Sequence, residues 1–285
     1  MHLTKARFFS GVFFLLVVFV FSSVAFPFDS AGQFAIRLSG GLGYLSLGEM
    51  NTGIKGALND IAFERDIHTN STYNDLKMGT NFGADLIYYL TPKIGVGIGG
   101  EFIHGSKTST YSFTGTQSGY ISSAPILTAV PLKVGLFFKT PLSGKINFTA
   151  TIGTGYYRTS LDNTYGWEIA NVAPATTERI KVSAWSPGFH AGVGLEYSIS
   201  RRFALFFEAL GRLAKANGFK GTVQYTGRSA VSAKLYSFDD VFAEGSFPIL
   251  DASNVVPSGG GIQNVREATI DLSGGSAFLG LVIRF

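Results

Sequence analysis

Eight segments of about ten residues dominate this sequence, and in each of them large apolar side chains alternate with glycine or polar side chains. Successive side chains of a β-strand point to opposite faces, so each segment predicts a strand with one apolar face. An amphipathic helix would instead repeat its apolar residues at spacings of three and four. The segments are residues 34–47, 80–90, 94–103, 130–139, 145–157, 188–199, 203–213 and 277–285.

The length and composition of these segments favour a membrane-spanning barrel. Strands of about ten residues cross a bilayer when tilted. The chain is 46% hydrophobic and only 15% charged, against about 25% charged in ordinary soluble domains. The face opposite the apolar one is largely glycine with isolated ionisable residues, which suits a barrel lumen better than a water-exposed surface. The alternative is a soluble antiparallel barrel or sandwich that buries its apolar faces.

The connections between the segments alternate between short and long. Residues 91–93, 140–144 and 200–202 form short links, whereas residues 48–79, 104–129, 158–187 and 214–276 form long, polar ones. Outer-membrane barrels combine short periplasmic turns with long extracellular loops. The prediction is therefore an all-β fold, a transmembrane antiparallel up-and-down barrel of eight strands. In the last loop, residues 222–226 and 233–238 predict a hairpin above the bilayer. The less favoured alternative is that they form two further strands of a ten-stranded barrel.

The first 25 residues read as a signal peptide, which leaves residues 26–285 as the barrel domain. Lys5 and Arg7 precede an apolar run that is too short for a membrane span, and small residues lead to a cleavage position after Ala25. The alternative is an uncleaved anchor. Cleavage lowers the number of basic residues from 23 to 21, against 19 acidic ones, so the charge gives no reason to expect nucleic acid as a partner. With no cysteine, disulfides and thiolate metal sites are excluded.

The last strand carries a further signal. Gly280, Ile283 and Phe285 resemble the C-terminal signature of outer-membrane barrel proteins, which the barrel-assembly machinery reads. Phe278 departs from the polar residue that this signature prefers. With the eight-strand plan, the chain resembles the superfamily of small outer-membrane barrels that includes the OmpA transmembrane domain, OmpX and OmpW. The resemblance implies a bacterial outer-membrane location, outer-membrane lipids as surroundings and the assembly machinery as a partner.

Ionisable residues on the inward phase of the strands form the candidate site. An eight-stranded barrel has an interior just wide enough for side chains to fill, and unpaired charges there would be very costly. We therefore predict a salt-bridged lumen that is closed. The alternative is a narrow conduit whose charges select small solutes. The inward charges are Arg37, Asp85, Glu101, Lys133, Glu196, Glu208, Arg212 and Arg284, with His190 among them.

Catalysis, metal binding and cofactors find little support in the sequence. His104 and Ser106 lie two apart on one strand, as in the His/Ser pair of outer-membrane lipid A deacylases, but no acidic residue is evident to orient the histidine. The four histidines show no metal-ligand spacing. We predict a structural or surface-interaction role, through loops that contact an extracellular ligand or surface partner. The alternatives are an OmpW-like channel or conduit for small hydrophobic solutes and, more remotely, a lipid-modifying enzyme.

Overall fold

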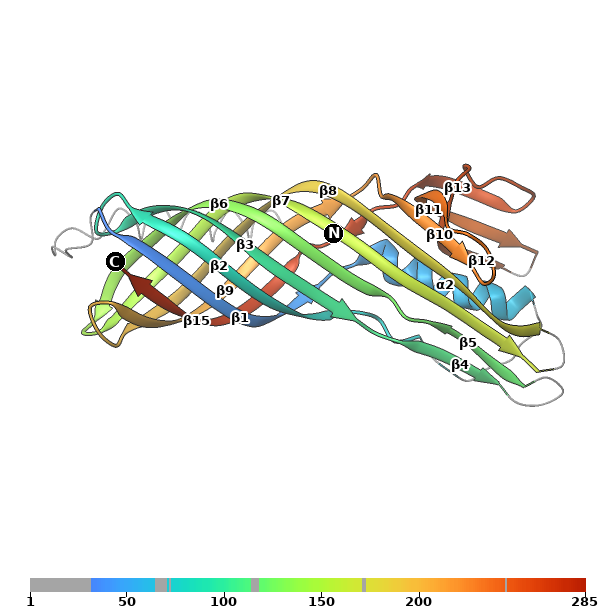
Figure 1. Ribbon diagram of the computed structural model, residues 1–285, viewed down its shortest axis with the longest axis horizontal. Helices are drawn as coiled ribbons and strands as arrows, with labels where there is room; N and C mark the ends of the chain where they lie inside the picture. Colours follow the sequence, from blue (N-terminus) through green and yellow to red (C-terminus); the bar gives the residue numbers. More distant parts are fainter. Residues whose placement is uncertain (1–31, 65–70, 72, 114–117, 171–172, 244) are drawn as a thin grey trace.

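The computed structural model describes residues 32–64, 71, 73–113, 118–170, 173–243 and 245–285. Eight antiparallel strands form a closed ring, in which each strand pairs with the next and β15 pairs with β1 (Figure 1). The eight-stranded barrel predicted from the sequence is confirmed. The ring consists of β1 (Phe34–Leu45), β2 (Met78–Tyr89), β3 (Ile94–Ser106), β6 (Ile126–Ser143), β7 (Ile146–Ile169), β8 (Ala173–Ser198), β9 (Phe203–Ala216) and β15 (Gly274–Arg284).

The outer surface of the ring is apolar. Leu132, Phe189 and Leu279 point outward and are 63, 65 and 68% exposed, and similar side chains surround the barrel. Soluble proteins rarely expose a continuous apolar surface of this extent. The wall is therefore in contact with lipid, and the barrel spans a membrane as predicted.

Three tight turns close one end of the barrel, which we call the turn end. One turn is shorter than expected, because β6 and β7 keep pairing at Thr140 and Phe148 and meet around Gly144. Gly144 has a positive φ of 52°, a conformation that glycine adopts without the steric cost of a β-carbon. β1 begins at this end and β15 ends there (Figure 1).

The long connections at the other end fold into one body, which we call the cap (Figure 1). It consists of α2 (Gly48–Glu64), β4 (Ser109–Phe113), β5 (Gly119–Ser123), β10 (Lys220–Tyr225), β11 (Val231–Phe242), β12 (Gly245–Ser253), β13 (Ile262–Glu267), β14 (Ile270–Asp271) and the outer parts of β6, β7 and β8. The predicted hairpin is confirmed as β10 and β11. These strands extend the wall above the ring without entering it, so the ten-strand alternative is wrong.

Helix α2 occupies part of a connection that was expected to be long and polar. Met50, Ile54 and Leu58 recur at a helical spacing and are fully buried. A β-carbon at Gly53 would lie 2.8 Å from the backbone nitrogen of Leu250, and one at Gly56 would overlap the carbonyl oxygen of Pro248. The two glycines therefore allow the helix backbone to lie directly against β12. No helix in the described ranges is long and apolar enough to span a membrane.

The apolar phase of the wall reverses where the ring passes into the cap. On β7, Ile152 and Tyr156 point outward, whereas Tyr157, Leu161 and Tyr165 point inward and are buried. Below this point, β7 presents apolar side chains to lipid on its outer face. Above it, the strand packs apolar side chains inward against a core. The reversal between residues 156 and 157 marks the lipid boundary.

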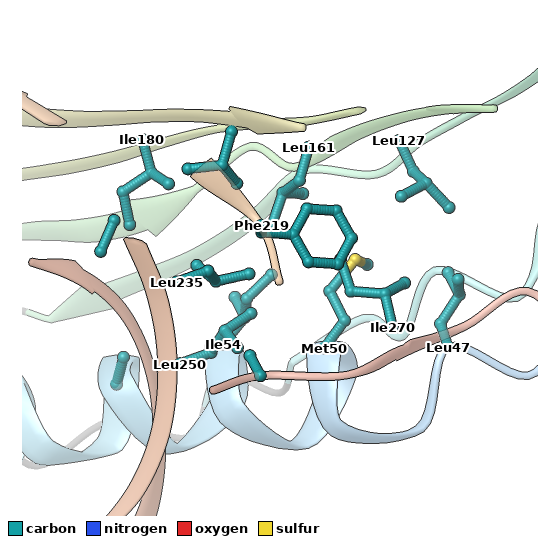
Figure 2. Close-up of a cluster of buried hydrophobic side chains, with 14 of the residues drawn as sticks. Leu47, Met50, Ile54, Leu127, Leu161, Ile180, Phe219, Leu235, Leu250 and Ile270 are labelled. Carbon is teal, nitrogen blue, oxygen red and sulfur yellow. The ribbon is translucent and has the colours of Figure 1, made fainter. Parts of the chain in front are cut away.

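All four long connections contribute side chains to this core. Figure 2 shows Met50 and Ile54 of α2 facing Leu161 and Ile180 of the wall, with Phe219 between them. The core lies directly over the mouth of the ring, so the cap covers the lumen with packed side chains.

Candidate functional site: the lumen and its cap

Glu101 lies at the centre of the lumen network. Its side chain is 2% exposed, and its two carboxylate oxygens lie 3.4 Å from the Lys133 ammonium and 3.3 Å from the Arg212 guanidinium. Arg212 is on β9, four strands around the ring from Glu101 on β3, so this pair crosses the whole lumen. Lys133 also lies 3.7 Å from Asp85.

A second pair lies beside this centre. The Arg37 guanidinium is 3.1 Å from the Glu208 carboxylate, which also accepts a hydrogen bond of 2.8 Å from Thr151. The Arg37 guanidinium is 4.1 Å from the ring centroid of Phe206, within cation–π range. Each charged group of this pair therefore has partners of suitable chemistry.

A third group lies near the turn end. Glu196 pairs with Arg284 and lies 4.0 Å from the Lys139 ammonium. Asn147 donates a hydrogen bond of 3.3 Å to the same carboxylate. The Lys139 ammonium also lies 4.8 Å from the ring centroid of Tyr89.

The structure thus places all eight inward charges of the sequence analysis inside the barrel, each within 4.0 Å of an opposite charge. The list of inward charges omits Lys139, although the strand pattern gives it the same inward phase as Lys133. Asn147 and Thr151 share the inward phase of their strand as well, but the pattern alone does not show that they bind Glu196 and Glu208.

Apolar side chains fill the lumen between the central and turn-end groups. Two cavities in the lumen have a volume of about 10 Å³ each, which is about the space of one water molecule. Residues of the ion pairs and apolar residues line both cavities. The apolar layer consists of Ala35, Ile87, Tyr89, Phe137, Ala204, Phe206, Leu210, Phe278 and Val282.

The histidine and serine residues named as candidates occupy different places in the barrel. His190 is buried in the lumen, and its Nδ1 has no hydrogen-bond partner in the described part of the chain. His104 points outward and stacks on Phe102 at 6.2 Å, and no hydrogen bond joins it to Ser106 among the described residues. This arrangement gives the enzyme alternative no support. The described residues contain no group of three or more metal-ligating side chains.

The C-terminal residues of the predicted assembly signal lie on β15 and directly after it. A β-carbon at Gly280 would meet the ring of Phe206 and the carbonyl oxygen of Leu38. The backbone nitrogen of Phe285 donates a hydrogen bond of 2.9 Å to Phe34. Ile283 faces outward on the wall, and Phe285 is 69% exposed. Both apolar side chains are therefore accessible from the membrane side.

The cap contains two carboxyl groups that face each other. Burial and the neighbouring Asp251 carboxyl raise the pKa of Glu178 to about 7. Burial also raises the pKa of Asp251 to about 6. Glu178 is on β8 and Asp251 is on β12, so the pair links the outer part of the wall to a strand of the cap.

This pair predicts a cap that loses stability as the pH rises. In the unfolded chain the two carboxyl groups have their ordinary pKa values of 4.5 and 3.8. The folded cap therefore binds more protons than the unfolded chain between about pH 4 and pH 7, and stability falls across that window. We expect a loss on the order of 2 kcal/mol between pH 5 and pH 8. Urea unfolding of the cap, followed by the fluorescence of Trp167, measures it. Asp251→Asn should flatten the dependence, whereas Asp75→Asn on the surface should not.

Comparisons with known proteins come from structure rather than sequence. No family model matches the chain, and no curated protein shows significant sequence similarity to it. The outer membrane protein OprG from Pseudomonas aeruginosa aligns over 90% of this chain and 97% of its own, with 12% identity and a TM-score of 0.40. The outer membrane protein AlkL, solved in DMPC bilayers, aligns over 92 and 96%, with 14% identity and a TM-score of 0.29. Values this low leave the activity of this chain to be inferred from its own residues.

Proposed function

We propose that the protein is a bacterial outer-membrane surface protein, in which a closed barrel anchors a folded cap that contacts a partner outside the cell. In this proposal the turn end faces the periplasm and the cap faces the exterior. The observation that carries it is the cap core, because side chains from all four long connections pack over the mouth of an ion-paired lumen. A chain built mainly to conduct solutes would have no need to fill its own mouth.

An aromatic cluster on the cap is the surface that we propose for the partner. Phe63 at the end of α2 lies 5.0 Å from Phe242 and 5.6 Å from Phe247, measured between ring centroids. Phe63 is 40% exposed, and aromatic residues are enriched at protein interfaces. Burial, together with Glu64 and Asp240, raises the pKa of the nearby Asp60 carboxyl to about 6. Crowded carboxyl groups beside exposed aromatic rings favour a partner with both cationic and apolar groups.

The route to the membrane also belongs to the proposal. Export through a signal peptide concerns residues 1–25, which lie outside the described residues. Recognition by the barrel-assembly machinery would use Gly280, Ile283 and Phe285, and the outward position of Ile283 and the exposure of Phe285 are compatible with that role. The surrounding lipids would contact the apolar belt.

Single-channel recording tests the closed lumen. We expect the purified protein to be silent in planar bilayers, because ion pairs and apolar side chains fill the described lumen. Arg212→Ala should produce brief openings rather than steady conductance, since it leaves Glu101 to recruit water while the apolar layer and the cap core stay in place. Glu208→Gln should have a smaller effect, because the amide still occupies the same space.

Arg179→Ala is the matched control, because it removes an arginine whose side chain is 54% exposed on the outside of the cap. It should stay as silent as the wild type. Steady conductance of the wild type, altered by the two lumen variants, would contradict the closed lumen and establish the narrow channel or conduit as the function.

A further inference from the structure

The outward face of the wall is basic on one side, just beyond the lipid boundary. Arg158 on β7, Lys181 on β8 and Lys220 on β10 are all exposed there. Tyr156 is the last apolar residue on the outward face of the ring in β7. Arg158 is the next residue on that face. The three side chains therefore lie on neighbouring strands of one continuous sheet.

The strand registers place these three residues in adjacent rows. Arg158 pairs with Trp185 on β8. Ser183, two residues before Trp185, pairs with Lys220. Lys181 comes two residues earlier again, diagonal to Lys220. Diagonal neighbours of this kind lie about 7–8 Å apart, so one anionic group can approach both ammonium groups.

The positive charge of this face is not neutralised by its own acids. Asp162 lies opposite Lys181, but its carboxylate accepts hydrogen bonds of 2.9 and 2.6 Å from Arg179. Within the described residues, Arg158, Lys181 and Lys220 have no ion pair. Lys220 lies directly opposite Lys234 across the β10–β11 ladder, and Glu267 forms an ion pair of 2.8 Å with Lys234. Because Asp162 and Glu267 are each engaged with another cation, Arg158, Lys181 and Lys220 leave an excess of positive charge on this face.

The height of the basic residues matches that of lipid headgroups. Trp185 stacks on Tyr156 at 5.4 Å, and tryptophan and tyrosine concentrate at the membrane–water interface. Two residues along a strand tilted by about 45° correspond to about 5 Å along the bilayer normal. Lys220 and Lys181 thus lie about 5 and 10 Å beyond this stack, and their flexible stems reach back toward the headgroup region, which is about 5–8 Å thick.

We propose that Arg158, Lys181 and Lys220 form a binding site for the phosphate group of an anionic lipid in the leaflet on the cap side. Arginine binds phosphate through two parallel hydrogen bonds, and lysine contributes a mobile point charge. The apolar belt directly below holds the acyl chains of the same lipid. This site lies at the base of the cap, and it does not depend on what the aromatic cluster contacts.

Native mass spectrometry of the whole protein in detergent micelles, titrated with phosphatidic acid, tests the site. The triple variant Arg158→Gln, Lys181→Gln, Lys220→Gln should bind this lipid about tenfold to hundredfold more weakly. A matched variant with Lys55→Gln, Lys107→Gln and Lys145→Gln removes three exposed positive charges elsewhere, and it should bind like the wild type. Phosphatidylcholine should bind weakly to all three proteins.

Three outcomes would overturn the proposal. Wild-type affinity of the first triple variant would show that these residues do not hold the phosphate. An equal loss in the matched variant would reveal a general effect of charge. Inorganic phosphate that competes as well as phosphatidic acid would indicate a site for a free ion rather than for a lipid. Unfolding curves of the variants in urea separate each of these from a folding defect.

Discussion

Replacing Glu101 with glutamine should destabilise the barrel by about 3–5 kcal/mol, because it leaves buried cations without their carboxylate. The substitution preserves the shape of the side chain and removes only its charge. Arg212 then has no carboxylate within ion-pair distance among the described residues, and Lys133 keeps only Asp85 at 3.7 Å. Urea unfolding of the protein in lipid vesicles measures the change in the free energy of unfolding.

Asp162→Asn is the matched control on the outside of the cap. It breaks the ion pair with Arg179, whose side chain is 54% exposed, and exposed pairs contribute at most about 1 kcal/mol. A double variant with Glu101→Gln and Arg212→Met should recover part of the loss, since it removes both the carboxylate and the cation left behind. Equal stability of the Glu101→Gln variant and the wild type would show that the lumen charges are hydrated rather than paired.

Gly56→Val should detach helix α2 from the cap. A β-branched side chain at this position collides with the backbone of Pro248, which cannot move without disrupting β12. The helix must therefore shift away, and it takes Met50, Ile54 and Leu58 out of the core. Strain and lost burial of this extent cost about 3–5 kcal/mol. Limited proteolysis should cut within α2, and hydrogen exchange should accelerate in β12 while the strands of the ring stay protected.

Lys55→Val places the same side chain on the exposed face of the helix, next to Gly56 in sequence. It carries the same loss of helix propensity from a β-branched residue, so it separates that effect from the collision with β12. We expect near-normal protection in this variant. Equal protection of α2 in the Gly56→Val variant would mean that the helix does not lie against β12.

The ring was predictable because each of its strands separates two environments. Lipid outside and a narrow lumen inside impose a strict period of two, as on β3, where Ile98 points outward between inward glycines. The same pattern identified which charges point inward. It could not show which of them pair, because Glu101 and Arg212 come together through the stagger of strands on opposite sides of the ring.

The cap was not predictable by the same pattern, although signals for it exist. On β7 the apolar phase reverses after Tyr156, so that Leu161 and Tyr165 point inward. A prediction based on apolar outward faces therefore ends this strand near Tyr156, although β7 continues. Met50, Ile54 and Leu58 have helical spacing, but Gly53 and Gly56 lie between them, and glycine disfavours a helix. The helix depends on β12, which lies far along the chain, because most helical stability in proteins comes from tertiary packing.

The contact between α2 and β12 has a consequence for the order of assembly. Glu49 and Arg266, 217 residues apart, form an ion pair of 3.0 Å beside this contact. The helix and its partner strand lie far apart in the chain, so the cap belongs to the slow, non-local contacts of folding. β1 likewise obtains its second neighbour only when β15 arrives. Completion of the cap and closure of the ring thus both wait for the C-terminal part of the chain, in which the cap strands β12 and β13 precede the closing strand β15.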